Sequence, residues 1–129
     1  MPLDEDVARL AKGKNLATVV TLMPNGQPQA LLTWVDADED HVLINTEVHR
    51  AKFRAVERDP RVTVTIWQRD DPYTYAEVRG QVVETVRGLK ARAHIDSLSR
   101  KYRGKDYDDA AITSERVILR IAPETVRFH

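Results

Sequence analysis

The sequence predicts a mainly β domain in which six antiparallel strands form a small barrel and helices lie at its periphery. Apolar and polar residues alternate in several short runs, and turn residues separate these runs. Only three stretches have the apolar spacing of a helix. The length of 129 residues fits one domain, and no repeat or low-complexity segment interrupts residues 1–129.

The first half of the chain is expected to contain a short helix and three strands. The helix covers Asp4 to Lys12, and one face of it carries the apolar residues Leu3, Val7, Leu10 and Ala11. Pro24-Asn-Gly-Gln27 is typical of a hairpin turn, because Asn-Gly occupies its centre. An acidic turn, Asp36 to Asp40, follows the hairpin. The expected strands are Asn15–Met23, Pro28–Val35 and His41–Thr46.

The second half is expected to contain two helices and three strands. The first helix runs from about His49 to Arg58 and ends at Asp59-Pro60. Gly80 indicates a bulge or a close approach of two backbones. The helix Leu89–Tyr102 has candidate core positions at Leu89, Ala93, Ile95 and Leu98. The remaining elements are the strand Arg61–Trp67, a loop at Arg69–Pro72, the long strand Tyr73–Val86, a loop at Gly104–Ile112 with one helical turn, and a last strand within Glu115–Phe128.

Composition excludes several classes of function. Lys plus Arg and Asp plus Glu both number 20, which argues against nucleic-acid binding by bulk charge. The absence of cysteine excludes disulfides, zinc thiolate sites and thiol nucleophiles. No signal peptide or long apolar run is present, so we expect a cytoplasmic protein without a membrane partner. We expect no metal site, because the histidines have no ligand spacing; they are His41, His49, His94 and His129.

The segment Val42–Phe53 gives the clearest functional signal. It is expected to be a strand that runs into a helix opening with Arg50 and Lys52, two residues predicted to lie at the surface. Unpaired N–H groups and the helix dipole favour an anion at such a helix start, most naturally a phosphate. The alternative is a solvated helix face, because Arg50, Arg54 and Arg58 form one stripe with a spacing of four.

Several sequence motifs, taken in order, resemble the flavin/deazaflavin oxidoreductase superfamily. They are Leu16-Ala-Thr-Val-Val-Thr, Pro24-Asn-Gly-Gln-Pro, Ile44-Asn-Thr with Arg50-Ala-Lys52, Asp59-Pro-Arg-Val62, Glu77-Val-Arg-Gly-Gln-Val82 and Arg120-Ile-Ala-Pro-Glu-Thr-Val126. The resemblance covers nearly the whole chain and implies an FMN-binding split β-barrel like that of the pyridoxamine 5′-phosphate oxidases. The segments His94-Ile-Asp96 and Arg100-Lys-Tyr102 are similar to the branch that uses coenzyme F420.

The resemblance also implies a homodimer with cofactor at its interface. It assigns the cofactor phosphate to Arg50 and Lys52, and it implies that the Asn45-Thr46 turn also helps to hold the cofactor. Thr46 could cap the helix or bond the phosphate, and the two roles are compatible. The strand Gln29–Trp34 would lie beside the tricyclic ring. Its residues Gln29, Leu31 and Thr33 share one face, and the alternative for them is ordinary barrel lining.

We therefore interpret the chain as an oxidoreductase that transfers a hydride from reduced F420 to an unsaturated organic small molecule. The alternatives are an FMN-dependent enzyme of the pyridoxamine 5′-phosphate oxidase type and a non-catalytic flavin- or deazaflavin-binding protein. No self-sufficient catalytic group is evident, which suits an enzyme whose cofactor carries the chemistry. The chain ends at Phe128-His129 without the further Arg- and His-bearing segment of vitamin B6 oxidases, which argues against that substrate. A dimer is also expected from apolar residues predicted on the outer face, Trp34, Trp67, Tyr73 and Tyr75.

Overall fold

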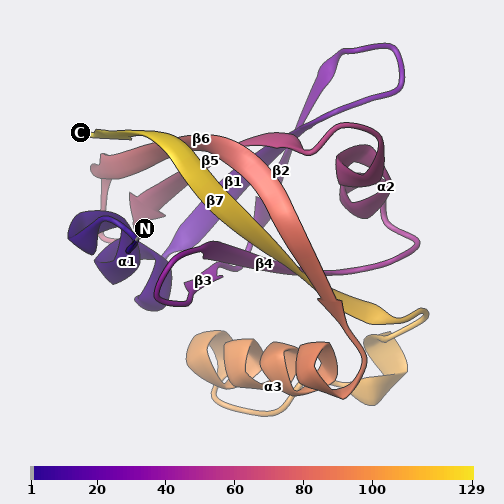
Figure 1. Ribbon diagram of the computed structural model, residues 1–129. Coiled ribbons are helices and arrows are strands. Elements are labelled where there is room, and N and C mark those ends of the chain that lie inside the picture. The colour runs from indigo at the N-terminus through magenta and orange to yellow at the C-terminus, as the bar shows by residue number, and fades with distance from the viewer. Residues whose placement is uncertain (1) are drawn as a thin grey trace.

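One curled antiparallel sheet forms most of the computed structural model, which describes residues 2–129 (Figure 1). Its strands are hydrogen-bonded in the order β2-β1-β5-β6-β7-β4-β3. This architecture confirms the predicted split-barrel fold. The strands are β1 Leu16–Leu22, β2 Pro28–Thr33, β3 Asp36–Ala37, β4 Val42–Glu47, β5 Arg61–Gln68, β6 Asp71–Arg87 and β7 Arg116–Phe128.

The prediction of six strands was wrong by one short strand, β3. Asp36 and Ala37, which were expected to begin an acidic turn, pair with Leu43 and Val42 of β4. The chain after β2 leaves the edge of β1 and returns beside β4, so these two residues reach a free sheet edge. The predicted loop at Arg69–Pro72 is also shorter than expected, because β6 already begins at Asp71.

The longest strand, β6, bends the sheet. It pairs with β5 on one side and β7 on the other, and its register against β7 shifts at Arg79/Gly80 and again at Val82/Glu84. A Cβ atom placed on Gly80 would lie 2.1 Å from the backbone oxygen of Ala122. The predicted bulge and close approach at Gly80 are therefore confirmed, and only glycine fits there.

Three α-helices of the described chain lie around the sheet: α1 Glu5–Lys12, α2 Ala51–Arg58 and α3 Leu89–Arg103 (Figure 1). A 3-10 turn, η1 Asp109–Ala111, follows α3. Asp4 begins α1 by accepting hydrogen bonds from the backbone N–H groups of Asp6 and Val7. No helix within residues 2–129 is long and apolar enough to cross a membrane.

The main core fills the inside of the curled sheet and includes fully buried residues of several strands and of α1; among the largest are Leu10, Val19, Val35, Ile44, Val64, Ile66, Leu119 and Ile121. α3 lies apart from the rest, below the sheet in Figure 1. It buries Ala91, Ile95, Leu98 and Ser99, as expected for Ile95 and Leu98. The predicted core positions Leu89 and Ala93 were wrong, because both belong to the opposite, exposed face of the helix.

Candidate functional site

A cavity of about 290 Å³ lies where β2, β4, α3 and the start of β7 meet the beginning of α2. Segments that are far apart in the sequence supply its wall. Apolar side chains are contributed by the strands and α3, and cationic side chains come from the other end. The lining residues are Leu16, Leu32, Thr33, Trp34, Asn45, Thr46, Arg50, Lys52, Ile95, Leu98, Tyr107 and Arg116.

The structure brings most of the predicted cofactor-binding residues to this cavity. Five of the seven line it directly: Thr33, Asn45, Thr46, Arg50 and Lys52. The other two, Gln29 and Leu31, line an adjoining hollow that shares Arg50 and Lys52 with the cavity. On β2, Gln29, Leu31 and Thr33 alternate with more exposed neighbours, so they do share one face as expected.

Lys52 differs from the expectation for it. As a residue near the start of a helix it was predicted to be a surface side chain, but only 8% of it is exposed. The reason is that α2 docks through the face that carries Lys52, Phe53, Ala55 and Val56. Burial, together with the positive charges of Arg50 and Arg116, lowers the pKa of Lys52 to about 8. Within residues 2–129 its ammonium has neither an ion pair nor a hydrogen bond.

Thr46 supplies a second polar group without a partner. Its hydroxyl is buried and forms no hydrogen bond within the described chain. Of the two roles considered for Thr46, capping of the helix does not occur, because α2 begins only at Ala51 and Arg50 occupies the capping position. A buried hydroxyl without a partner is unfavourable in an empty protein interior. Because Thr46 also lines the cavity, a ligand bound there would lie beside this hydroxyl.

Arg116 is a cavity residue that sequence reasoning missed. It begins β7 and pairs across the sheet with Glu47, the last residue of β4. Its Nη1 lies 3.4 Å from a carboxylate oxygen of Glu47, and its Nε donates to the side-chain oxygen of Asn45 at 2.9 Å. The guanidinium carbon lies 5.3 Å from the centre of the Tyr107 ring. The alternation of apolar residues after Arg116 predicts a strand with buried positions, but it does not indicate that Arg116 itself reaches the cavity.

Glu47 holds the two arginines of the site. This fully buried carboxylate accepts hydrogen bonds from the backbone N–H groups of Thr113 and Ser114, both at 2.8 Å. It also pairs with Arg50 at 3.4 Å. Burial would raise the pKa of Glu47, but the N–H donors and the charge of Arg116 outweigh burial and lower it. Glu47 therefore remains ionised, and two arginines, Arg50 and Arg116, share this single carboxylate.

Asn45 lies in the wall but has no free donor for a ligand. One amide hydrogen is donated to the backbone oxygen of Ala91 at 3.0 Å, and the other to the ring of His94 at 3.0 Å. The amide oxygen accepts from Arg116. The geometry supports an indirect role for Asn45, which is to hold Arg116 in place.

An aromatic wall closes the other end of the cavity. Trp34 stacks on Tyr102 with ring centres 5.1 Å apart and contacts Tyr107 edge-on. Trp34 was predicted on the outer face, which was wrong because it packs under α3. Burial raises the pKa of Tyr102 to about 12, and its hydroxyl hydrogen-bonds to the backbone of Asn15 and Val35. Of the other predicted outer residues, Tyr73 is 89% exposed and Tyr75 stacks on His129.

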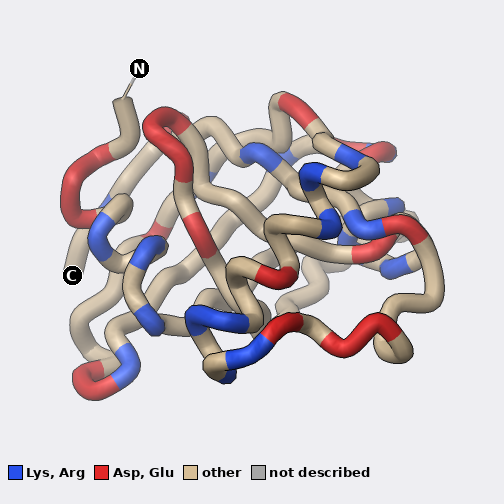
Figure 2. The backbone as a smooth tube through the Cα atoms, turned by 90° about the horizontal axis from the view of Figure 1, so that it is seen from below, with Lys and Arg blue, Asp and Glu red and all other residues tan. Residues whose placement is uncertain are grey.

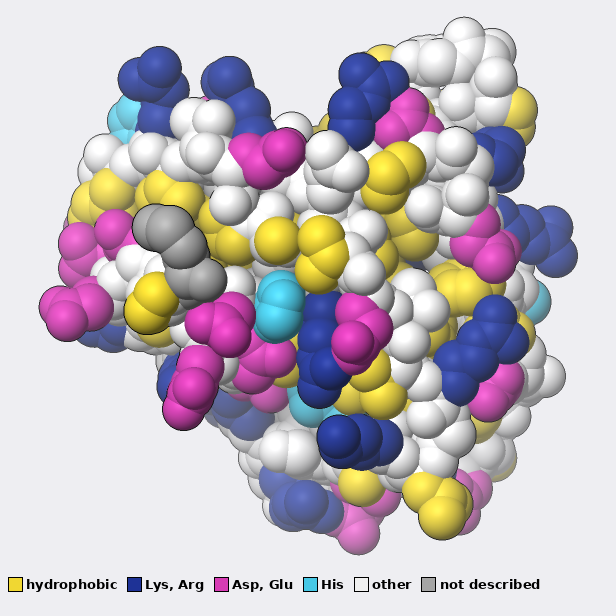
Figure 3. Space-filling view, viewed as in Figure 1, with side chains coloured by type: hydrophobic (Ala, Val, Ile, Leu, Met, Phe, Trp, Pro, Cys, Tyr) yellow, Lys and Arg dark blue, Asp and Glu magenta, His cyan; other side chains and the backbone are white. Residues whose placement is uncertain are grey.

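The cavity differs from the surface in view because it gathers positive side chains, whereas positive and negative side chains are interspersed over that surface. In Figure 3 dark blue and magenta side chains are interspersed over the face in view, and Figure 2 shows the same mixture along the backbone from the α3 side. The predicted stripe of Arg50, Arg54 and Arg58 is exposed along α2. The buried cations Lys52 and Arg116 continue from this stripe into the cavity.

Comparison with known proteins identifies the family. The family model described as pyridoxamine 5′-phosphate oxidase matches residues 3–129. The chain belongs to this family. A comparison with curated proteins gives no match. Family membership and fold together support an oxidoreductase of the flavin type.

Among solved structures, an F420 reductase is 26% identical to this family member, with a TM-score of 0.83 over 97% of this chain and 98% of that one. A conserved hypothetical protein from Mycobacterium tuberculosis is 24% identical, with a TM-score of 0.73 over 98% and 84% of the two chains. General stress protein 26 from Bacillus anthracis is 17% identical, with a TM-score of 0.71 over 96% and 91%. The last two show the fold alone.

Proposed function

We propose that this protein is an F420-dependent oxidoreductase that reduces an unsaturated organic small molecule. The observation that carries the proposal is the cavity, which is lined by the largely buried Lys52 with its unpartnered ammonium and by Thr46 with its buried, unpartnered hydroxyl. Groups of this kind fit an anionic oxygen, and phosphate is the anion that flavins and deazaflavins share. The similarity to an F420 reductase over nearly the whole of both chains favours the deazaflavin.

Different residues of the cavity would bind different parts of the cofactor. Lys52, Arg116 and the Thr46 hydroxyl would hold the phosphate, and Arg50 would close the site from its exposed side. Leu32, Thr33 and Trp34 would lie beside the ring system and exclude water from it. Reduced F420, when bound, supplies the hydride. The chain itself orients the cofactor and the acceptor, which is the main contribution of proteins to cofactor chemistry.

The exposed part of the cationic surface favours F420 over FMN. F420 carries a phosphodiester and a polyglutamate tail, so it presents negative charge beyond the phosphate. Arg54 and Arg58 extend the cationic surface from Arg50 along α2 in the direction such a tail could follow.

A homodimer is part of the proposal. Leu32 is 62% exposed on the edge strand β2, and it borders both the cavity and the adjoining hollow. Apolar exposure beside an open site is typical of a surface that a second subunit covers. The partner would then complete the ring-binding side of the site.

Titration of the purified protein with F420 and with FMN tests the function directly. F420 is expected to bind, and its reduced form to be oxidised when a suitable unsaturated acceptor is present. Tight FMN binding with a yellow protein and no F420 binding would instead support the FMN-dependent alternative. F420 binding without oxidation by any acceptor would support a non-catalytic carrier.

A further inference from the structure

We propose that His94 is a positioning residue for the anion site, and that it acts on Arg116 through the side-chain amide of Asn45. His94 itself lines no part of the cavity. Its effect on ligand binding rests on the proposed function, whereas its effect on Arg116 does not. The proposal stands on a continuous chain of hydrogen bonds that crosses β3, α3, β4 and β7.

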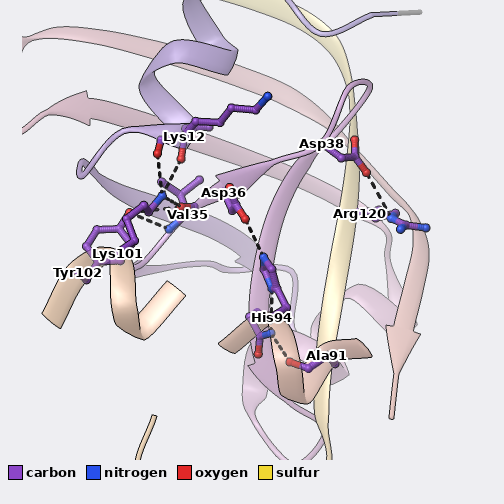
Figure 4. Close-up of polar contacts among 11 residues, drawn as sticks. Lys12, Val35, Asp36, Asp38, Ala91, His94, Lys101, Tyr102 and Arg120 are labelled. Atoms are coloured by element: carbon purple, nitrogen blue, oxygen red, sulfur yellow. Dashed lines mark hydrogen bonds and ion pairs between the residues drawn. The ribbon is translucent and has the colours of Figure 1, made fainter. Parts of the chain in front are cut away.

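The first links of this chain fix the tautomer of His94. Its Nε2 lies 2.9 Å from a carboxylate oxygen of Asp36, and Figure 4 shows His94 between Asp36 and the backbone of Ala91. Its Nδ1 lies 3.0 Å from the amide nitrogen of Asn45. Because that nitrogen donates, Nδ1 must accept, and the ring proton belongs on Nε2, where Asp36 receives it.

The next link fixes the orientation of Asn45. With His94 accepting on one side and Ala91 O on the other, both amide hydrogens of Asn45 are used. The amide oxygen then faces Arg116 Nε at 2.9 Å. A flipped amide would place N–H against N–H at Arg116 and oxygen against oxygen at Ala91. The acceptor on His94 and the backbone oxygen of Ala91 together therefore hold the amide in the one orientation that binds Arg116.

The orientation of Arg116 depends on the hydrogen bond to Asn45, because its other contacts restrain the guanidinium less. The ion pair with Glu47 is 3.4 Å long between Nη1 and a carboxylate oxygen, which is longer than the bond from Nε to Asn45. The contact with Tyr107 restrains the plane of the guanidinium but not its rotation within that plane. Without the hydrogen bond from Nε, the guanidinium could rotate within its plane and would no longer be held in the orientation that points into the cavity.

Two conservative variants separate positioning from simple packing. The side-chain oxygen of Asn sits where His Nδ1 does, so His94→Asn keeps the acceptor for Asn45 and loses the bond to Asp36. His94→Gln has carbon at that position and loses the acceptor. His41→Gln is the matched control, because His41 forms a similar pair with Asp38 at 3.0 Å and does not line the cavity.

The decisive measurement is hydrogen exchange of the Arg116 Nε–H, followed by NMR without ligand. We expect slow exchange in the wild type, His94→Asn and His41→Gln, and clearly faster exchange in His94→Gln. F420 affinity, measured in parallel, should fall at least about fivefold in His94→Gln only, which is the effect of one ordinary hydrogen bond.

Equal exchange in His94→Asn and His94→Gln would overturn the proposal. The proposal would also be overturned if the wild type binds F420 and His94→Gln shows faster exchange of the Arg116 Nε–H but the same F420 affinity as the wild type. If the wild type binds no F420, the proposed function fails, and the exchange of Arg116 Nε–H still decides whether His94 positions it. Melting curves of all variants confirm that each one folds.

Discussion

Replacing Lys52 by methionine is expected to stabilise the protein and weaken its ligand binding at the same time. Methionine is similar in length to lysine and carries no charge. In the wild type the whole Lys52 residue is only 8% exposed, and its ammonium has no partner among the described residues. Burial, with the charges of Arg50 and Arg116, lowers the pKa from its ordinary 10.5 to about 8.

The size of the stability gain follows from that shift. A displacement of about 2.5 pKa units corresponds to roughly 3 kcal/mol, the upper limit of the gain in free energy of unfolding. Because the folded-state pKa of a base is lowered, the charged form destabilises the fold fully below about pH 8. This penalty disappears as the pH rises toward 10.5, where the amine is neutral in both states. The difference between Lys52→Met and wild type should therefore shrink over pH 8 to 10.5.

Binding should change in the opposite direction. A charge-assisted contact contributes about 1.5–3 kcal/mol, so F420 affinity should fall roughly ten- to hundredfold. Wild-type affinity should also decline above pH 8, as the free protein loses the Lys52 proton, and this decline should be absent in Lys52→Met. Urea unfolding at pH 7 and pH 10 and F420 titration across this range measure both effects.

The matched control is Lys90→Met, which removes an exposed lysine of α3. Its unfolding free energy should change by less than about 0.5 kcal/mol at either pH. If Lys52→Met unfolds more easily than wild type at pH 7 and binds F420 equally well, the interpretation of Lys52 as a buried anion ligand is refuted.

Three further changes test other parts of the structure. Arg116→Lys keeps the charge but loses the Nε donor to Asn45, so F420 affinity should fall about tenfold by titration, with little loss for Arg127→Lys on the exposed end of β7. Gly80→Ala forces a carbon to within 2.1 Å of Ala122 O, and we expect a loss of about 1–3 kcal/mol in urea unfolding; an unchanged midpoint would contradict the close approach. Leu32→Asp should convert a dimer to monomer in sedimentation and lower F420 affinity, whereas a wild type that is already monomeric would remove the dimer from the proposal.

The sequence was sufficient for most of the fold because its signals were local. Alternation marked the strands, Asn-Gly marked the hairpin turn, and the glycine at position 80 marked the bend. The same local signal brought Thr46, Arg50 and Lys52 together, since they lie within seven residues around one strand-to-helix connection.

What could not be predicted depends on tertiary packing. Lys52 is buried because of how α2 docks on the sheet, which its own sequence does not specify. Arg116 joins the site through its pairing with Glu47, across a separation of 69 positions that no local pattern can predict. Trp34 turns inward because Tyr102 and Tyr107 approach it from α3 and the following loop.

The charge of the site gives a last prediction that separates the two cofactors. Arg50, Lys52 and Arg116 line the cavity, and the one carboxylate paired with them, Glu47, contacts only the two arginines, so the site carries an excess of two positive charges below pH 8. A phosphomonoester such as that of FMN gains a proton near pH 6 and falls from two negative charges to one. A phosphodiester such as that of F420 keeps its single charge over the whole range, and Glu47 stays ionised because its pKa is lowered.

FMN affinity should therefore drop between pH 7 and pH 5, whereas F420 affinity should stay nearly constant over the same interval. Fluorescence titration at pH 5, 6 and 7 with both cofactors measures this directly. A parallel decline for both cofactors would show that a protein group, rather than the ligand phosphate, takes up the proton. In that case the excess of positive charge at this site would not be what selects the ligand, and the assignment of the three cations to the phosphate would have to be abandoned.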